Sequence, residues 1–365
     1  MIIALSDAFD NVDFSIDAVS RAAVDTICQS VARGEHFLLA SRRLAIKLSN
    51  EAALSHTTRG VMEWLRSEYT YIKGLLNGFR YRVEVCPAAA RFERQPNLQE
   101  WVVPAKHVAD FGIRPTILLA ENSHDGDVYC FAAKHYMIEA KLQGVQLRIE
   151  PRNGNGAGIS QELSRIAKEK IEFCLCITDS DRLAPTCEPG EIARACARVT
   201  KGSHSVIDHT FAGARELENA IPHTLFKQVA EDSHPDTWDE FQERLSVVPD
   251  EAVRFADLKN GVLLCSIFKF AKTSPQRTYW LKVATEVFPG SDCLEQERCD
   301  NAEDCKCSVL PGFGENIARG VRERLGGCSS HESYRTAKAS ANIDDWMMLG
   351  QAVLEAGAAP PRMRL

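Results

Sequence analysis

The chain has 365 residues, with 43 lysines and arginines against 50 aspartates and glutamates, and a net charge of −7. This balance excludes a uniformly basic nucleic-acid coat, although it allows a local basic groove, because electrostatic steering depends on how charge is distributed. Apolar residues make up 45% of the chain and charged residues 25%, as in soluble globular proteins. The length suffices for two or three domains that each bury a core.

Residues 1–108 are expected to form an N-terminal α+β domain with a scaffold or assembly role. Residues 15–31 and 51–75 carry apolar side chains at helical spacing. Residues 81–85 and 100–103 alternate between apolar and polar side chains, as short strands do. We find no chemical motif in this region.

Residues 109–225 are predicted to form an α/β domain with a mostly parallel sheet, because apolar runs alternate with helical stretches. Near-continuous apolar runs are typical of strands that are covered on both faces. The expected strands are residues 116–120, 145–149, 173–178 and 204–207, and the expected helices are residues 127–142, 159–170 and 190–199.

Residues 226–365 are predicted to be mainly helical, with candidate helices at 237–245, 258–270 and 276–287. A cysteine-rich stretch follows these candidates. We expect the final residues, GAAPPRMRL, to be frayed.

Acidic residues follow three of the expected strands. Glu121 follows the run 116–120, and Asp179 and Asp181 follow the run 173–178, while Glu216 and Glu218 come after the strand 204–207 and a short loop. Ligands of parallel α/β sheets bind beyond the carboxyl ends of the strands, so these acids should meet in one cleft. Clustered carboxylates repel unless a cation neutralises them. Hard oxygen ligands favour Mg²⁺ or Mn²⁺.

A glycine-rich loop, residues 151–158, follows the second strand of this region and precedes a helix. Gly154 and Gly156 would let the backbone approach a ligand closely, and the helix N-terminus favours an anion such as phosphate. The spacing and position differ from the dinucleotide-binding fingerprint, so we exclude that function. The chain also has no Walker A sequence.

The order of these motifs resembles a TOPRIM domain, the metal-binding module of topoisomerases, bacterial primases and OLD-family nucleases. That pattern has a glutamate after the first strand (here Glu121), glycines after the second, and Asp-x-Asp (here Asp179 and Asp181) after the third. The segment 216–219, Glu-Leu-Glu-Asn, is similar to the acidic motif of TOPRIM proteins in anti-phage systems. The chain departs from the pattern in having Glu121-Asn instead of Glu-Gly, so the aspartate that opens the next helix is Asp125 or Asp127.

The resemblance implies a TOPRIM-like, Rossmann-like sheet and a Mg²⁺- or Mn²⁺-dependent nuclease that cleaves DNA or RNA. It implies that metals are held by the acids of the domain: Glu121, Asp127, Asp179, Asp181, Glu216 and Glu218. Substrate would be bound by the glycine loop and by nearby cations: Gly154, Gly156, Lys134, Arg182 and Arg215. It further implies a role as effector of bacterial anti-phage defence, gated by a partner ATPase or sensor protein.

Other interpretations of these motifs stay open. Asp-x-Asp at a strand end also forms turns and helix N-caps, and Glu216 and Glu218, two residues apart, would not share one face of a helix. Haloacid-dehalogenase phosphatases place Asp-x-Asp after their first strand and follow it with Thr or Val, whereas Leu183 stands here. Glycosyltransferases use Asp-x-Asp without a later Glu-Leu-Glu-Asn. A phosphatase, a nucleotidyltransferase, or a non-catalytic nucleic-acid-binding or assembly subunit of a defence complex are the remaining alternatives.

Four cysteines lie close together near the C-terminus, at Cys293, Cys299, Cys305 and Cys307. Four thiolates can hold a structural Zn²⁺, although their spacing differs from the paired Cys-x2-Cys pattern. Cys328 is an alternative ligand, and a polar loop with free thiols is the alternative structure.

The sequence also favours a cytoplasmic protein that does not associate with a membrane. The first ten residues lack the basic region of a signal peptide, and no apolar run approaches the ~20 residues of a membrane-spanning helix. The 13 cysteines are an odd number, which favours reduced thiols over a disulfide scaffold.

Overall fold

The computed structural model describes residues 1–95, 99–170, 172–299 and 307–364. The chain forms two compact units. The first contains Met1–Ile177, Ala195–Thr210 and Gly350–Leu365, and the second contains Thr178–Arg194 and Phe211–Leu349. Both units are therefore built from segments that are separated in the sequence.

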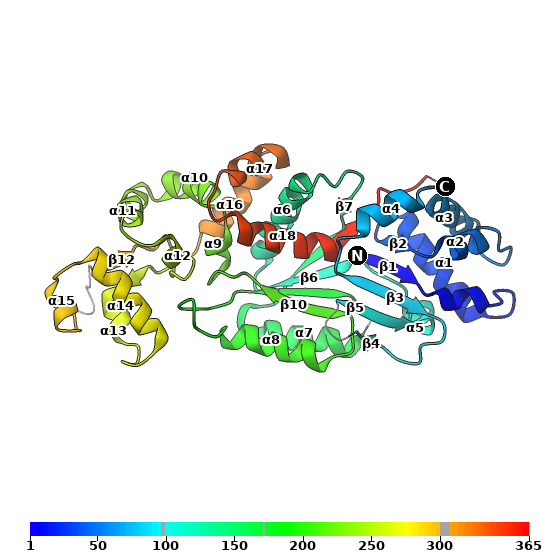
Figure 1. Cartoon of the computed structure of the whole chain (residues 1–365), viewed down its shortest axis with the longest axis horizontal. Coiled ribbons are helices and arrows are strands. Elements are labelled where there is room, and N and C mark those ends of the chain that lie inside the picture. The colour runs from blue at the N-terminus through cyan, green and yellow to red at the C-terminus, as the bar shows by residue number, and fades with distance from the viewer. Residues whose placement is uncertain (96–98, 171, 300–306, 365) are drawn as a thin grey trace. The chain divides into compact units, whose positions relative to one another are not determined.

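The first unit begins with a five-stranded sheet in the order β2-β1-β3-β5-β4 (Figure 1). Its parallel strands are β1 (Ile2–Leu5), β2 (Phe37–Leu39), β3 (Arg82–Cys86) and β5 (Glu100–Pro104), and β4 (Glu93–Arg94) pairs antiparallel with β5. Strands β3 and β5 confirm the alternation seen at 81–85 and 100–103, and their buried positions also alternate.

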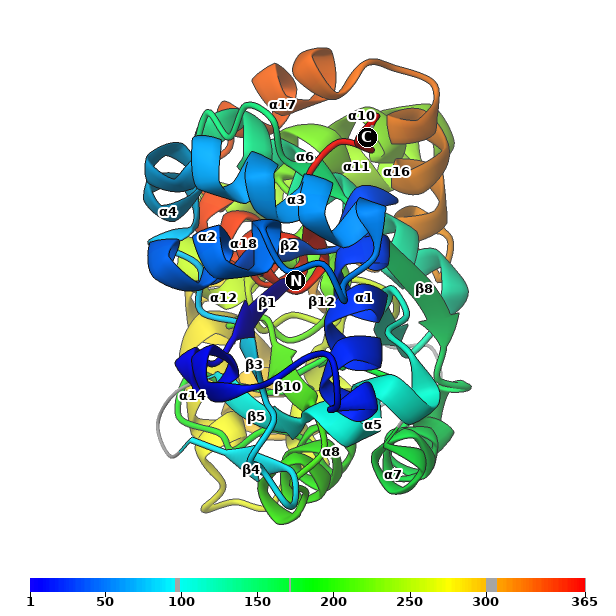
Figure 2. The same ribbon diagram turned by 90° about the vertical axis from the view of Figure 1, so that its right-hand side faces the viewer.

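Helices complete the N-terminal part of this unit, and α1 packs against α3 and α5 (Figure 2). The helices are α1 (Ala18–Ala32), α2 (Arg42–Ser49), α3 (His56–Ser67), α4 (Tyr69–Leu76) and α5 (Ala105–Phe111), with a 3₁₀ helix at Asp7–Asn11. Asp17, Ser41 and Ser55 cap α1, α2 and α3 by accepting backbone hydrogen bonds with their side chains, which satisfies amide groups that a helix leaves unpaired.

A second sheet in the order β10-β9-β6-β8 confirms the predicted α/β region. The strands are β6 (Thr116–Ala120), β8 (Ile149–Asn153), β9 (Cys174–Thr178) and β10 (Ile207–Phe211), and β6 pairs in parallel with both β8 and β9. Every residue of β6 and β9 is buried, as expected of strands covered on both faces. The helices of this region are α6 (Ser123–Glu139), α7 (Ile159–Glu169) and α8 (Glu191–Gly202).

Two of the expected strands have different bounds. The run 145–149 is divided, because β7 (Gln146–Leu147) pairs antiparallel with β13 (Ala358–Ala359) and β8 starts only at Ile149. Between them, the N–H of Arg148 donates to the carbonyl of Gly357, at the end of α18 (Ile343–Gly357). The run 204–207 only leads into β10, which continues to Phe211.

The second unit is mainly helical, and most of its helices lie in the region 226–365 for which helices were predicted. Its helices are α9 (Leu217–Ala220), α10 (His223–Ser233), α11 (Pro235–Leu245), α12 (Asp250–Val253), α13 (Leu264–Phe268), α14 (Pro275–Val287), α15 (Asp292–Glu295), α16 (Ile317–Gly326) and α17 (Ser330–Lys338). A core of aromatic rings joins Phe226, Trp238 and Phe241 to Phe313, with ring centroids 5.0–6.4 Å apart.

The prediction of a single helix at 258–270 is wrong. Gly261 adopts φ +78°, and a Cβ placed on it would lie 2.8 Å from the backbone nitrogen of Gly312. The chain therefore turns at Gly261 and forms the short strand β11 (Val262–Leu263), antiparallel to β12 (Ser308–Leu310), before α13 begins.

Among the described residues, no helix is both long and apolar enough to cross a membrane.

Candidate functional site

The Asp-x-Asp sequence forms a tight turn directly after β9. The backbone N–H groups of Ser180 and Asp181 both donate to the carbonyl of Arg215 at 2.9 Å, and Oγ of Ser180 donates to the carbonyl of Ala214 at 2.7 Å. Asp181 has φ +51°, a left-handed conformation that is uncommon outside glycine but better tolerated by aspartate. The turn is therefore fastened to the segment that leads into Glu216.

A direct contact joins the two acidic motifs. The backbone N–H of Leu217, the first residue of α9, donates to Oδ1 of Asp179 at 2.8 Å. Glu216 is the N-cap residue of α9, so Asp179 and Glu216 meet at one helix start, where negative charge is favoured. Glu216 and Glu218 are buried, with 8% and 4% of their surfaces exposed.

Asn219 locks this arrangement. Its Oδ1 accepts a hydrogen bond from the N–H of Glu216 at 3.0 Å. Its Nδ2 donates to the carbonyls of Val253 and Ala256 at 2.7 and 3.0 Å. Because Asn219 is itself buried, its amide group fixes the start of α9 against the α12 region.

Two basic residues balance the buried carboxylates. Nζ of Lys259 lies 3.5 Å from Oε2 of Glu216 and 3.3 Å from Oε2 of Glu218. Arg215 lies 3.2 Å from Oε1 of Glu216 and 3.0 Å from Oδ2 of Asp257. Burial lowers the pKa of Lys259, but the carboxylates of Glu218, Glu216 and Asp179 raise it by more. The pKa of Lys259 therefore lies above its ordinary value. Lys259 is therefore held as a cation.

The candidate site residues predicted from the sequence did not include Lys259 and Asp257, because no local motif marks them. Oδ1 of Asp257 accepts hydrogen bonds from the N–H groups of Lys259 and Asn260 at 3.1 and 2.7 Å. The only local signal was the Asp-Leu-Lys-Asn-Gly sequence at 257–261, which is typical of a turn. Its closeness to the acidic motifs arises only in the folded chain.

The other predicted metal ligands have the following surroundings. Asp181 belongs to the second unit, and its side chain packs against Gly190. Glu121 and Asp127 belong to the first unit, where the carbonyl of Glu121 accepts the N–H of Gly156 at 2.9 Å. Asp125 opens α6, because it forms a capping box with Asn122, while Asp127 lies within the helix.

The glycine loop is a packing feature of the first unit. The N–H of Gly154 donates to the carbonyl of Ala120 at 2.7 Å, so it is not available to a ligand. A Cβ on Gly154 would lie 2.6 Å from Cγ1 of Ile159 and 2.9 Å from the Ala120 carbonyl oxygen. Gly156 has φ +57° and an open space beside it, so its role is conformational.

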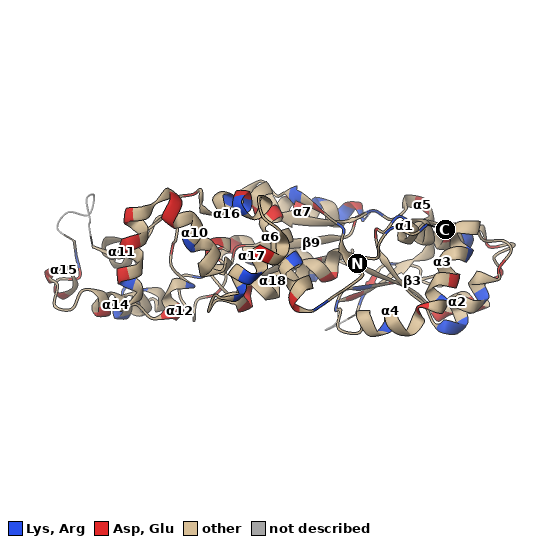
Figure 3. Ribbon diagram, turned by 90° about the horizontal axis from the view of Figure 1, so that it is seen from above, with Lys and Arg blue, Asp and Glu red and all other residues tan. Residues whose placement is uncertain are grey.

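The three cations chosen as substrate contacts have partners within the protein. Lys134, on α6, lies over the ring of Phe131. Arg182 donates to the carbonyls of Cys187 (2.9 Å) and Pro185 and lies over the ring of Phe255. Together with the ion pairs of Arg215, these contacts give each of the three cations a partner within the chain. Basic and acidic residues are interspersed over the helices of each unit (Figure 3).

The cysteine cluster is only partly described. Cys293 lies in α15 and Cys307 directly precedes β12, while Cys305 lies outside the described residues. Cys293, Cys299, Cys307 and Cys328 are not in disulfides. The zinc site stays a prediction.

The acidic site offers oxygen atoms of the kind that divalent cations bind, but it is not assembled as a metal site. Asp179, Glu216 and Glu218 offer hard oxygen ligands, and Oε2 of Glu216 is buried without a hydrogen bond from the part of the chain that the structure describes. In the present conformation, no three or more His, Cys, Asp or Glu among the described residues form a ready set of metal ligands. The ammonium group of Lys259 lies where such an ion would neutralise Glu216 and Glu218.

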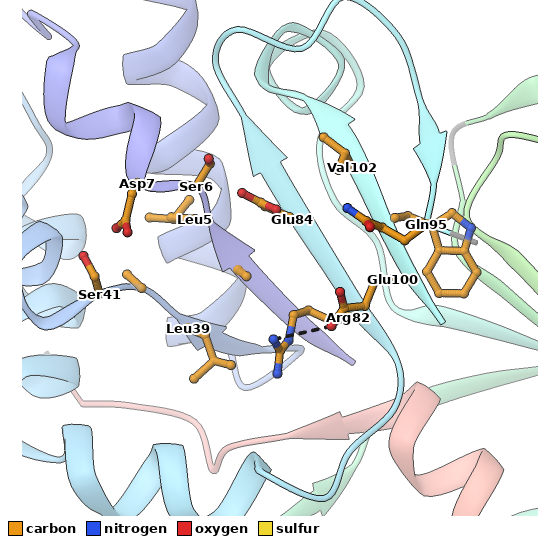
Figure 4. Close-up of a pocket in the computed structure, with 13 residues that line it drawn as sticks. Leu5, Ser6, Asp7, Leu39, Ser41, Arg82, Glu84, Gln95, Glu100 and Val102 are labelled. Carbon is orange, nitrogen blue, oxygen red and sulfur yellow. Dashed lines mark ion pairs between the residues drawn. The ribbon is translucent and has the colours of Figure 1, made fainter. Parts of the chain in front are cut away.

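A separate cavity of about 260 Å³ lies in the first unit (Figure 4). It is lined by residues that follow β1 and β2, including Ser6, Asp7 and Ser41, and by the polar side chains of β3 and β5. Arg82 and Glu100 form an ion pair there at 3.5 Å. This cavity contains none of the residues that the sequence motifs singled out.

Comparisons with protein-family models, curated proteins and solved structures gave no match for this chain.

Proposed function

We propose that this chain is a Mg²⁺- or Mn²⁺-dependent nuclease with a TOPRIM-like centre, in which Asp179, Glu216 and Glu218 hold the metal. One observation carries the proposal. Two acidic motifs about 37 residues apart in the sequence meet through the hydrogen bond from the N–H of Leu217 to Asp179, and the carboxylates they bring in are buried. If Asp179 belonged only to a solvated turn or a simple N-cap, it would have no need to contact the second acidic motif.

The residues of the chain would share the work. Asp179, Glu216 and Glu218 would bind the ion, and Asn219 and Arg215 would hold Glu216 in place through the contacts described above. When bound, Mg²⁺ or Mn²⁺ would lower the pKa of a water molecule and stabilise charge on a phosphate. The ligand roles of Glu121, Asp127 and Asp181 are supported by the sequence resemblance alone.

The wider role is supported by the same resemblance. TOPRIM proteins that carry an acidic motif like residues 216–219 act in anti-phage systems, so we infer a cytoplasmic defence effector that cuts DNA or RNA. An unrestrained nuclease would be toxic, and the chain has no Walker A sequence. We therefore infer that a separate ATPase or sensor protein controls it.

A second candidate is a non-catalytic nucleic-acid-binding or assembly subunit. The ion pairs of Lys259 and Arg215 with Glu216 and Glu218 favour it, because they neutralise the acids without any metal. In that case, nucleic acid would bind without being cut.

The deciding experiment incubates the purified chain with Mn²⁺ and DNA, tRNA or other RNA, with and without its partner ATPase. We expect cleavage, and a loss of rate on the order of 10²-fold or more in Asp179→Asn and Glu216→Gln, because each change removes a ligand charge. Asp239→Asn, an exposed acid on α11, is the matched control. Intact substrates, or equal rates in all variants, would reject catalysis at this site.

A further inference from the structure

We propose that the cavity of the first unit binds a small aliphatic amine, such as a short diamine, through the carboxylates of Asp7 and Glu84. The site combines a hollow on a parallel sheet, two carboxylates without a basic partner and apolar side chains between them. It shares no residue with the acidic motifs, so it does not depend on the proposed function.

The cavity includes the place where parallel sheets most often bind ligands. The chain leaves β1 through α1 toward β2 on one side, whereas β3, on the other side of β1, leads away to β5. Ligands bind at the carboxyl ends of neighbouring strands whose connections run in opposite directions. Ser6 and Asp7 directly follow β1 and line the cavity. The N–H of Ser6 also donates to the carbonyl of Val85 in β3 at 3.0 Å, so the two strand ends are joined there.

The strand register leaves one face of this sheet hollow. One row of side chains crosses β2, β1, β3 and β5 and lines the cavity, and it consists of Leu39, Ala4, Glu84 and Val102. All four are only half-buried, whereas the intervening strand positions, which face the other way, are buried. Parallel sheets are normally covered on both faces. A face that places a charged side chain beside the small Ala4 therefore has room for a ligand.

The lining of the cavity carries more acid than base. Glu100 is paired with Arg82 at 3.5 Å, whereas Asp7 and Glu84 form no ion pair or hydrogen bond through their carboxylates with the part of the chain that the structure describes. In the view of Figure 4, Glu84 lies between Asp7 and the ion pair. Two carboxylates that are not neutralised attract a cation.

An organic amine fits this lining better than a metal ion or an anion. The described residues contain no group of three or more His, Cys, Asp or Glu that could hold a metal ion, and an anion would be repelled by the carboxylates. An ammonium group can donate to acceptors that lie apart, including the hydroxyl oxygens of Ser6 and Ser41. Leu39 and Val102 can contact the methylene groups of the ligand. The cavity of about 260 Å³ is smaller than the ~300–1,000 Å³ of typical ligand pockets, so the ligand is small.

The test measures binding of butane-1,4-diamine to the full chain by calorimetry at low ionic strength, with butane-1,4-diol as the uncharged control. We expect the diamine to bind with a Kd of about 1 mM or lower, and the diol not to bind. Glu84→Gln and Asp7→Asn preserve the shape of each side chain and should each weaken binding about 10-fold. Glu63→Gln removes an exposed acid of α3, which lies outside the cavity, and should leave the affinity unchanged.

Ala4→Leu tests the cavity itself, because it fills space beside Glu84 and preserves every charge. It should weaken binding of the diamine about 10-fold or more. A general attraction of the diamine to the net charge of −7 would persist in Ala4→Leu and in Glu84→Gln, and this result would overturn the proposal. So would a diamine that does not bind at about 10 mM. If Ala4→Leu lowers the Tm strongly, Glu84→Gln still decides, because it changes only the charge.

Discussion

Asp181 and Gly190 are in such close contact that glycine is the only residue that fits opposite the aspartate. A Cβ built on Gly190 would lie 2.5 Å from Cβ of Asp181 and 2.7 Å from its Oδ2. The N–H of Gly190 also donates to the carbonyl of Ser180 at 2.7 Å. The far end of the loop that follows β9 therefore returns to hold the Asp-x-Asp turn in its left-handed conformation.

Gly190→Ala should disturb this turn. The added methyl group must displace Asp181 or the loop backbone, and we expect a loss of about 1–3 kcal/mol in the free energy of unfolding, as for other overpacked sites. If the turn positions Asp179, cleavage should also slow. The measurements are denaturant unfolding and the nuclease assay.

The matched control is Gly326→Ala at the end of α16, where nothing lies within 4 Å of the new methyl group. It should leave the stability within about 0.5 kcal/mol or raise it slightly. Equal stabilities of Gly190→Ala and the parent protein would show that the loop yields easily and does not constrain Asp181.

Tyr81→Phe should destabilise the first unit. The hydroxyl of Tyr81 donates to Oδ2 of Asp208 at 3.0 Å, and Arg94 donates to Oδ1 at 2.8 Å. Asp208 is buried, so losing one donor leaves an oxygen poorly satisfied, at a cost of about 1–3 kcal/mol. Tyr71→Phe removes an exposed hydroxyl that bonds to the carbonyl of Gln143 and should cost less than about 0.5 kcal/mol. Equal losses in the two variants, measured by denaturant unfolding, would contradict this account.

The strands that were predicted correctly share one physical property. Strands β6 and β9 are buried on both faces, so their apolar runs reflect the burial directly. Strands β1 and β2 were not predicted, although all but one residue of each strand is buried. They are only four and three residues long, which is too short for a periodic signal.

The acidic site was predictable only in part, and for a similar reason. Asp179 and Glu216 could be expected to approach each other, because both follow strands that run into the same region of the fold. The arrival of Lys259 depends on the turn at Gly261 and its packing on Gly312, a long-range contact that leaves no local pattern. The same contact explains why the helix expected at 258–270 does not form.

Stability should fall with acid because of His36. This side chain is fully buried, its Nε2 lies 2.9 Å from the carbonyl oxygen of Arg114, and burial lowers its pKa from 6.5 to about 3. Between these values, the unfolded chain binds a proton that the folded protein does not, so the free energy of unfolding decreases as the pH falls below 6.5. The contribution is about 1.4 kcal/mol per pH unit.

His36→Gln keeps a donor for the Arg114 carbonyl and cannot titrate. Denaturant unfolding between pH 6 and pH 4 should therefore show a shallower loss of stability in this variant, by roughly 1 kcal/mol per pH unit. Parallel curves for His36→Gln and the parent protein would mean that His36 does not remain neutral in the fold.

The zinc content of the protein can be tested separately, because the cysteine cluster is chemically independent of the carboxylate site. Soft thiolates prefer Zn²⁺, and carboxylates prefer Mg²⁺ or Mn²⁺. Protein purified without added metal should contain one Zn²⁺ per chain by elemental analysis, and a chelator should lower its Tm, since a structural zinc stabilises the fold that binds it. Replacing Cys293 and Cys307 with serine should remove the zinc, whereas Cys86→Ser, a half-buried thiol at the end of β3, should not. Mn²⁺ binding at Asp179 and Glu216 uses different ligands, so the affinity for Mn²⁺ should survive the loss of zinc. Purified protein that contains no zinc would contradict the predicted zinc site and leave these thiols as unliganded side chains.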